Sequence, residues 1–211
     1  MSSVSLCDIT KGNEVLANIE AANKRRNALK RRFPQLAELY ERFIEPKFQA
    51  AAGHRNSFIV EAAPVVYRVV CVPLALQLLD FFYDMHPDLF KDSPEQHHYE
   101  AQKMLESVAA SYRESLSAIE RKIYDVLSGV EQDAFRILRD LALRSEPKRE
   151  PFQFFMSCKQ LGDRLQIDRQ SAYRLLRRFE REYRLITCVD KGKPWTPGEE
   201  PRASVFRWLL A

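Results

Sequence analysis

Five arginines near the carboxyl end of the chain have spacings that bring them to one side of a helix. Arg169, Tyr173 and Arg177 recur at intervals of four, as do Gln170, Arg174 and Arg178. Residues four apart are neighbours on a helix surface, so these polar groups share a face. Guanidinium groups pair with phosphates and with guanine edges in a major groove. The residues expected to contact DNA are Arg169, Gln170, Tyr173, Arg174, Arg177, Arg178 and Arg181, with Arg169, Gln170 and Arg174 nearest the bases.

The other side of the same segment is apolar, as the packed face of a helix requires. The buried stripe is expected to consist of Ala172, Leu175, Leu176, Phe179 and Tyr183. Asp168 suits the N-cap of this helix, 169–183. A shorter helix, capped by Ser157 and ending at Leu165, precedes it across the turn 166–168. Two helices in this order predict a helix-turn-helix whose second helix enters the groove.

Strand-like segments flank the helix pair. β-branched and apolar residues at 185–189 and 203–209 predict two strands, and Phe152 to Met156 predicts a third. A loop rich in Gly, Pro and Lys joins the first two strands, as in a β-wing at 187–209. Lys191 and Lys193 in this loop are expected to touch a flanking DNA backbone. The predicted fold is mainly α, a helical bundle followed by a winged helix-turn-helix with a small antiparallel β-wing.

The distribution of charge agrees with a DNA-binding carboxyl end. Residues 157–186 hold eight basic and four acidic residues, so they carry the chain's whole formal net charge of +4. Positive charge focused on one region is the electrostatic footprint of a nucleic-acid binder. We therefore expect DNA as the partner, with duplex DNA preferred over a single strand.

The rest of the 211-residue chain has the composition of a globular helical protein, with 45% hydrophobic residues, 29% charged residues and six glycines. Its patterns predict helices at 14–45, 57–71, 74–85, 93–117, 118–127 and 131–143. Ser93 suits the N-cap of the helix at 93–117, and Gln96 stands at its capping-box position. Pro34 is expected to kink the first of these or to start a second helix. A charged segment with two prolines, 144–151, is the predicted linker between a bundle domain, 1–143, and a winged-helix domain, 152–211.

A basic run in the first helix has two interpretations. Residues 24–32 contain six basic side chains, in Lys24-Arg25-Arg26 and Lys30-Arg31-Arg32. They could form a second phosphate-binding face. Alternatively, they form a solvated surface that Glu38, Glu41 and Glu45 balance, and a localisation signal is a third reading.

Two stretches resemble mobile-element replication proteins. Gly53-His54-Arg55-Asn56 with the later Glu106-Ser107-Val108 is similar to the helical domain that follows the catalytic part of phage and plasmid primase-polymerases. Ala203-Ser204-Val205-Phe206-Arg207-Trp208-Leu209 resembles the end of winged-helix domains in such proteins. The resemblance implies a role in replication of a mobile element or plasmid, with replication proteins as further partners. It also implies a second nucleic-acid contact by Arg55 and Asn56, unless these two residues only hold the helix entry. Arg184 departs from the family pattern, because a glycine usually ends the recognition helix there.

Enzymatic residues are not expected. Primase-polymerase catalysis needs metal-binding carboxylates on a sheet, and the chain has no strand-rich region for them. A phosphate-binding Gly-x-x-x-x-Gly-Lys-Ser/Thr loop is also missing from the sequence. His97 and His98 are adjacent, so on a helix they point about 100° apart and suit packing better than a metal site. We expect a non-enzymatic protein with no cofactor and no bound metal.

Other sequence features point to the cytoplasm. No run of about 18 apolar residues is present, so no membrane span is expected. The first residues lack the basic and apolar regions of a secretory signal. Cys7, Cys71, Cys158 and Cys188 are scattered without a Cys-x-x-Cys motif, which favours reduced thiols.

Two other functions fit the same sequence. A transcription regulator would use the helical bundle to dimerise or to sense a ligand, and it would prefer a palindromic site. An interaction scaffold would use the winged helix to dock a protein, with weak or no DNA binding. The sequence leaves open the DNA site recognised and the oligomeric state.

Overall fold

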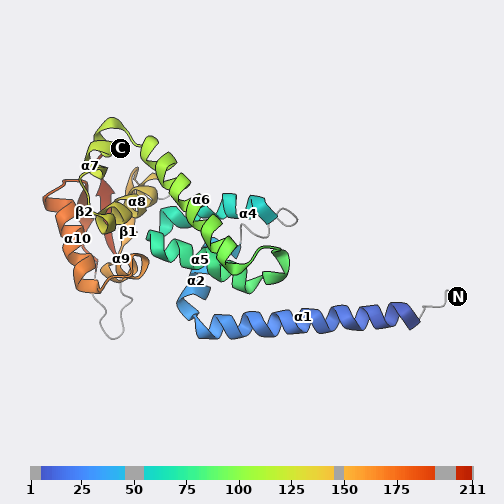
Figure 1. Ribbon diagram of the computed structural model, residues 1–211. Coiled ribbons are helices and arrows are strands. Elements are labelled where there is room, and N and C mark those ends of the chain that lie inside the picture. The colour runs from blue at the N-terminus through green and yellow to red at the C-terminus, as the bar shows by residue number, and fades with distance from the viewer. Residues whose placement is uncertain (1–5, 46–54, 145–149, 193–202, 211) are drawn as a thin grey trace, which may run out of the picture.

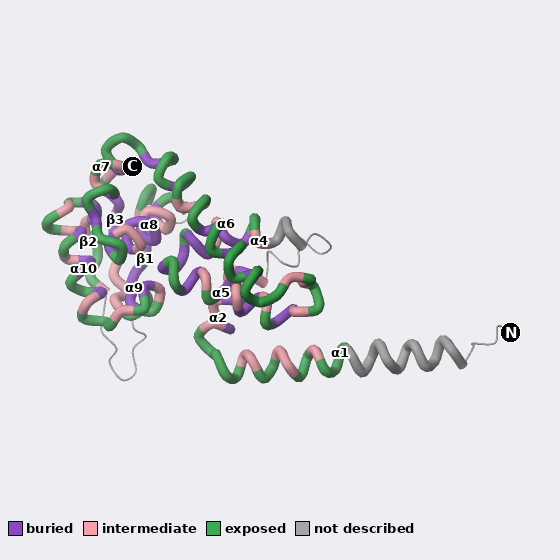
Figure 2. Tube along the Cα trace, viewed as in Figure 1, coloured by how far each residue is buried: buried purple, intermediate pink, exposed green. Residues whose placement is uncertain are grey.

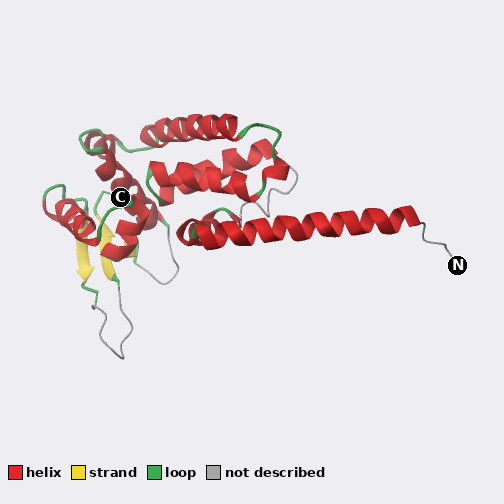
Figure 3. Cartoon of the chain, turned by 60° about the horizontal axis from the view of Figure 1, so that its bottom comes forward, coloured by secondary structure: helices red, strands yellow, loops and turns green. Residues whose placement is uncertain are grey.

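The computed structural model describes residues 6–45, 55–144, 150–192 and 203–210, and within these ranges the side chains other than those of 6–18 and 55–58. The described chain is mainly helical, with a small three-stranded antiparallel sheet (Figures 1 and 3). The elements in chain order are α1 (Leu6–Arg32), α2 (Pro34–Phe43), α4 (Arg55–Val69), α5 (Val72–Met85), a 3-10 turn (Pro87–Leu89), α6 (Pro94–Glu114), α7 (Ala118–Tyr124), α8 (Gly129–Leu143), β1 (Gln153–Met156), α9 (Cys158–Leu165), α10 (Arg169–Arg181), β2 (Ile186–Asp190) and β3 (Ser204–Trp208).

Pro34 starts a second helix, which decides between the two expectations for it. The break falls at Phe33, because the residue before a proline is disfavoured in the helical conformation. The long α1 that precedes it extends away from the other helices, and only its carboxyl end lies against them (Figure 1).

Part of the basic run of α1 is engaged within the molecule. Arg25 pairs with Asp88 at 2.9 Å, and Lys30 pairs with Glu41 at 2.5 Å. Arg26, a third member of the run, forms hydrogen bonds with the end of α5. Lys24, Arg31 and Arg32 are exposed. Half of the run therefore anchors α1, and half faces solvent.

His86, which follows α5, accepts a hydrogen bond from Arg26 of α1. Arg26 donates to His86 Nδ1 at 3.0 Å and to the carbonyl oxygen of Met85 at 3.2 Å. Nε2 of the same ring then carries the hydrogen and faces Tyr40 Oη at 2.8 Å. Burial first, and then the charge of Arg26, lower the pKa of His86 to about 4. The imidazole is therefore neutral at pH 7, and it holds α1 and α2 on the end of α5.

Helices α4, α5 and α6 pack together to form the body of the bundle. Ser93 caps α6 as expected, since its Oγ accepts from the amide of Gln96 at 3.3 Å. The Gln96 side chain, which the sequence placed in a capping box, instead donates to Glu100 Oε1 at 2.8 Å. This i,i+4 pair replaces the local bond to the cap.

Capping boxes also define α7 and α8. Ser117 and Glu120 cap the first, and Ser128 and Glu131 cap the second. The predicted start of α8 at residue 131 was therefore two residues too late, because Glu131 is the third residue of the helix and bonds back to Ser128.

The sheet has the strand order β1-β3-β2. Phe154 of β1 lies opposite Phe206 of the central strand, β3. A register shift between Cys188 and Asp190 carries β2 to Asp190, one residue beyond its predicted end. β1 starts at Gln153, one residue later than expected, because Phe152 has a φ of 63° and cannot extend the strand.

Helix α8 contacts the bundle, the sheet and α9. The ring of Phe135 meets that of Trp208 edge-on at 5.0 Å between centroids. On the bundle side, Arg136 donates to the carbonyl oxygen of Val70 at 3.0 Å. Buried residues form one continuous core through both regions (Figure 2). The predicted boundary at residue 143 thus follows a helix that already packs against the sheet.

Three residues, 166–168, join α9 to α10. Their backbone packs closely against Gly162 of α9. The amide of Ile167 donates to the carbonyl oxygen of Gly162 at 3.0 Å, and Gln166 takes the left-handed conformation with a φ of 56°. A Cβ atom at Gly162 would lie 2.7 Å from the carbonyl oxygen of Ile167. Only glycine lets the turn approach the helix this closely.

Gly162→Ala is therefore expected to lower the free energy of unfolding by about 1–3 kcal/mol, the usual cost of overpacking. Alanine favours helices, but the clash is with backbone that cannot rotate away. Gly129→Ala is the matched control, because a Cβ there meets nothing within 4 Å. Urea unfolding of both variants checks this, and equal stability of the two would contradict the tight-turn argument.

Helix α10 ends at Arg181, two residues before the expected end. The amide of Tyr183 bonds to the carbonyl oxygen of Arg178, and Leu185 bonds to that of Phe179 at 2.8 Å. Arg184 adopts a φ of 51° in the position where the resemblance expected glycine. A left-handed conformation costs a non-glycine residue about 1–2 kcal/mol, so the surrounding bonds hold this cap against its own preference.

Candidate nucleic-acid interface

The two faces of α10 differ in the way the sequence predicted, except at Tyr183, which lies beyond the end of the helix and is half-buried. Ala172, Leu175, Leu176 and Phe179 are buried against α9 and the sheet. The opposite face is exposed along its length, as the green segments of α10 show in Figure 2. The exposed polar residues on it are Arg169, Gln170, Tyr173, Arg174, Arg178 and Arg181, with Arg177 half-buried beside them. The structure thus brings the predicted set onto one helix surface.

Asp168 holds the amino end of this helix. Its Oδ1 accepts from the amides of Gln170 at 2.8 Å and Ser171 at 3.0 Å, and its Oδ2 accepts from Ser171 Oγ. These bonds lower the pKa of Asp168, with the hydroxyl of Ser171 as the largest cause. The carboxylate therefore fixes the first turn, where Arg169 and Gln170 project.

Arg177 and Arg178 already have partners within the protein. Arg177 Nε donates to Tyr173 Oη at 3.1 Å, and its Nη1 pairs with Glu180 Oε2 at 2.5 Å. Arg178 pairs with Glu131 of α8 and donates to Tyr183 Oη at 2.9 Å.

The carboxylate of Glu131 is buried and also caps α8 through Ser128 at 2.9 Å. Arg178 therefore joins α10 to α8, in addition to facing solvent. No sequence signal indicates this pairing, since Glu131 lies 47 positions before Arg178 and each looks like an ordinary surface residue of its own helix.

Arg169, Arg174 and Arg181 differ from these two arginines. Across the described parts of the chain they make no ion pair and no side-chain hydrogen bond. All three are exposed. The helix thus presents arginines that pair with no carboxylate among the described residues, although Arg181 lies within the field of Glu180, and such exposed positive charge favours binding of a phosphate backbone.

The remaining predicted contacts are only partly described. Lys191 directly follows β2 and is exposed. It lines the same cavity as Tyr173 and Arg177 of α10, so it lies beside that helix. Lys193 lies outside the described residues. Arg55 and Asn56 form the first turn of α4, but their side chains are outside the described set, so the second contact stays a prediction.

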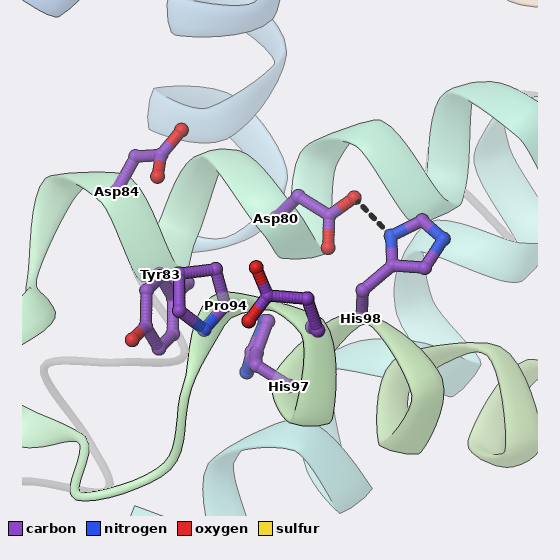
Figure 4. A pocket seen from close by; sticks show the side chains of 7 residues that line it. Asp80, Tyr83, Asp84, Pro94, His97 and His98 are labelled. Carbon is purple, nitrogen blue, oxygen red and sulfur yellow. Dashed lines mark hydrogen bonds and ion pairs between the residues drawn. The ribbon is translucent and has the colours of Figure 1, made fainter.

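A second polar cluster lies between α5 and α6, where the sequence raised and set aside a metal reading (Figure 4). The cavity is lined by Asp80, Tyr83, Asp84, Pro94, Glu95, His97 and His98. His98 Nδ1 lies 2.8 Å from Asp80 Oδ2, and the buried His97 has its Nε2 3.1 Å from the carbonyl oxygen of Leu79. Burial and the charge of Asp80 raise the pKa of Asp84.

The acidic character of this cavity opposes the binding of a phosphate group. Among the side chains described, no group of three or more His, Cys, Asp or Glu residues has a metal-binding arrangement. His97 packs between the helices, and His98 makes a surface hydrogen bond with Asp80. The cluster therefore adds nothing to the interface on α10.

The described helices include none that combines the length and the apolar character needed to cross a membrane. Comparison of the chain with protein-family models, with curated proteins and with solved structures gives no match.

Proposed function

We propose that the chain binds duplex DNA through α10, with β2 and β3 acting as a wing. The observation that carries the proposal is the row of exposed arginines without acidic partners, Arg169, Arg174 and Arg181, on one face of a capped helix. On this face Arg178 is four residues from Arg174 and three from Arg181, and like charges at these spacings repel each other in the isolated protein. A polyanionic partner removes this cost.

The order of the elements supports this assignment. From α8 onward the chain runs α8-β1-α9-α10-β2-β3, and the strands pair in the order β1-β3-β2. This order is compatible with the proposed winged helix-turn-helix, in which α9 would brace α10 and the hairpin would lie beside it. In this assignment the unit begins at α8 rather than after a linker, because α8 packs on the sheet and on α9.

The proposed DNA contacts differ between the amino-terminal and carboxyl-terminal halves of α10. Arg169, Gln170 and Arg174 in its amino-terminal half reach base edges, since the start of a recognition helix lies deepest in the groove. Arg181 and the wing residue Lys191 contact phosphates, which position the protein without reading sequence. Tyr173 and Glu180 hold Arg177, and Glu131 holds Arg178, so these two arginines mainly orient the helix.

The biological setting belongs to the proposal as well. The similarity to mobile-element replication proteins implies that this DNA binding serves replication of a plasmid or phage. In that setting the chain is a non-enzymatic accessory protein of the cytoplasm.

Fluorescence anisotropy with labelled duplex and single-stranded DNA over a salt series tests the proposal. Binding to the duplex is expected to weaken with salt with a log–log slope of roughly −2, as for the two phosphate contacts of Arg181 and Lys191. The single strand is expected to bind more weakly. A duplex affinity that does not change with salt, or tighter binding of the single strand, would contradict the proposal and favour a protein-docking role for α10.

A further inference from the structure

A second cavity, unrelated to the α10 surface, lies where the bundle meets α8. Its volume is about 460 Å³, which is within the size range of small-molecule sites. Helices α4 and α8 and the end of α6 form its walls. The lining residues are Pro64, Val65, Arg68, Tyr112, Ser115, Arg139, Asp140, Leu143 and Arg144.

Three arginines face this cavity from two helices. Arg68 of α4 is exposed and makes no ion pair with any described residue. Arg139 of α8 is held by Glu120 through two bonds, of 2.6 and 3.2 Å. Arg144 pairs with Asp140 at 2.5 Å. The orientation of Arg139 is thus fixed in advance, while the charge of Arg68 is available to a ligand.

The hydroxyl of Tyr112 is the second observation that points to a ligand. The residue is only 7% exposed. Its Oη lies near the Arg139 guanidinium, which can only donate, so the hydrogen of the hydroxyl has no acceptor within the described chain. The guanidinium of Arg139 lies 5.9 Å from the centre of the same ring. A buried hydroxyl whose hydrogen has no acceptor is unfavourable, so an acceptor atom entering the cavity would satisfy it.

Positive charge around the end of α8 exceeds the negative charge. Besides the three lining arginines, Arg164 lies close enough to interact with both Arg42 and Arg144, and Asp140 is the carboxylate that acts on Arg164 in the opposite sense. Burial, then the charges of Arg42 and Arg144, lower the pKa of the Arg164 guanidinium to about 10. Repulsion among these groups makes the region favourable for an anion.

We propose that this cavity binds a small phosphate monoester. The phosphate group accepts from Arg68, Arg144 and Tyr112 Oη, and Ser115 lies within the same wall. The organic part of the ligand packs on the apolar atoms of Pro64, Val65 and Leu143. A small ligand with a terminal phosphate matches a cavity of about 460 Å³ with a partly apolar wall better than the backbone of a duplex does. The ligand bridges α4 and α8 and thereby stabilises the contact between bundle and wing unit.

Thermal unfolding of the full chain at constant ionic strength tests this site. The probes are adenosine monophosphate, ribose 5-phosphate and inorganic phosphate, with adenosine and ribose as uncharged controls. The expected result is a saturable rise in Tm with at least one ester and no rise with the uncharged compounds, because a ligand that binds the folded state stabilises it. No rise with any of the phosphate compounds would overturn the proposal, as would equal rises with adenosine and its phosphate.

Substitutions of cavity residues test whether the ester-dependent rise in Tm comes from binding in this cavity. Arg68→Gln is expected to reduce the ester-dependent rise in Tm by at least half, and Tyr112→Phe to reduce it without destabilising the ligand-free protein. Arg113→Gln is the matched control, since Arg113 is an exposed arginine of α6 that pairs with Asp125 outside the cavity. An unchanged rise in Arg68→Gln would overturn the site. If Arg68→Gln instead weakens duplex binding and no ester raises the Tm, the cavity takes a DNA phosphate and the small-ligand proposal is wrong.

Discussion

Replacing Arg136 with alanine is expected to lower the free energy of unfolding by about 3–5 kcal/mol, the usual cost of leaving one half of a buried ion pair without its partner. The side chain is fully buried and donates to Asp133 and, at 3.0 Å, to the carbonyl oxygen of Val70. Its guanidinium also lies 3.8 Å from the centre of the Tyr67 ring. Alanine removes all three contacts and leaves a cavity between α8 and α4.

Urea unfolding followed by circular dichroism measures this effect. Arg136→Met keeps most of the buried volume, so it is expected to lose less stability than the alanine variant. Arg113→Ala removes an arginine from a surface pair with Asp125 and is expected to change stability little. If Arg136→Ala were as stable as Arg113→Ala, the contact between the bundle and α8 would not depend on this arginine.

The double substitution Arg169→Ala with Arg174→Ala is expected to weaken duplex binding by at least about tenfold. Each arginine contact to a base edge contributes about 1–3 kcal/mol, and 1.4 kcal/mol corresponds to a factor of ten in affinity. Both side chains are exposed and have no intramolecular partner among the described residues, so their removal is expected to leave the fold intact.

Two controls separate this effect from a general loss of charge. Lys122→Ala removes an exposed cation from a different helix, α7, and should retain wild-type affinity. Arg178→Ala removes an arginine of α10 that is paired with Glu131, so it should reduce stability more than affinity. An affinity loss in Arg178→Ala as large as in the double variant would show that the intramolecular pairing does not decide which arginines bind DNA.

Local signals in the sequence predicted the starts of α6, α7, α9 and α10, whereas α1, α4, α5 and α8 begin two to eight residues earlier than expected. Ser93, Ser157 and Asp168 cap the helices they were expected to cap, because each needs only an oxygen that reaches the amides of the next turn. The apolar stripe of α10 was likewise visible from its spacing. Such features depend on residues within one or two turns of each other.

Contacts between distant segments were not predictable in the same way. Arg178 belongs to the same basic stripe as Arg174, and only the fold brings Glu131 to one of them. Arg136 looks like a surface arginine, yet it is buried because α4 covers it. The division of α10 into engaged and free arginines therefore required the three-dimensional arrangement.

The ends of the strands and of α10 also depend on tertiary context. Arg184 takes a left-handed conformation that its residue type disfavours, and Phe152 does the same before β1. Backbone bonds across the sheet hold both, such as that from the amide of Trp208 to the carbonyl oxygen of Phe152 at 3.0 Å. Residue preference alone places these boundaries one or two positions away.

Site-specific photo-crosslinking tests the central claim, that α10 lies on DNA, most directly. A benzoylphenylalanine placed at Tyr173, on the exposed face of α10, is compared with one at Tyr99 on α6. The two tyrosines are similarly exposed, at 49% and 57%, so accessibility does not distinguish them. We expect crosslinks to duplex DNA from position 173 and none from position 99. Equal crosslinking from both positions, or crosslinking from position 99 alone, would contradict the assignment of α10 as the DNA-binding helix.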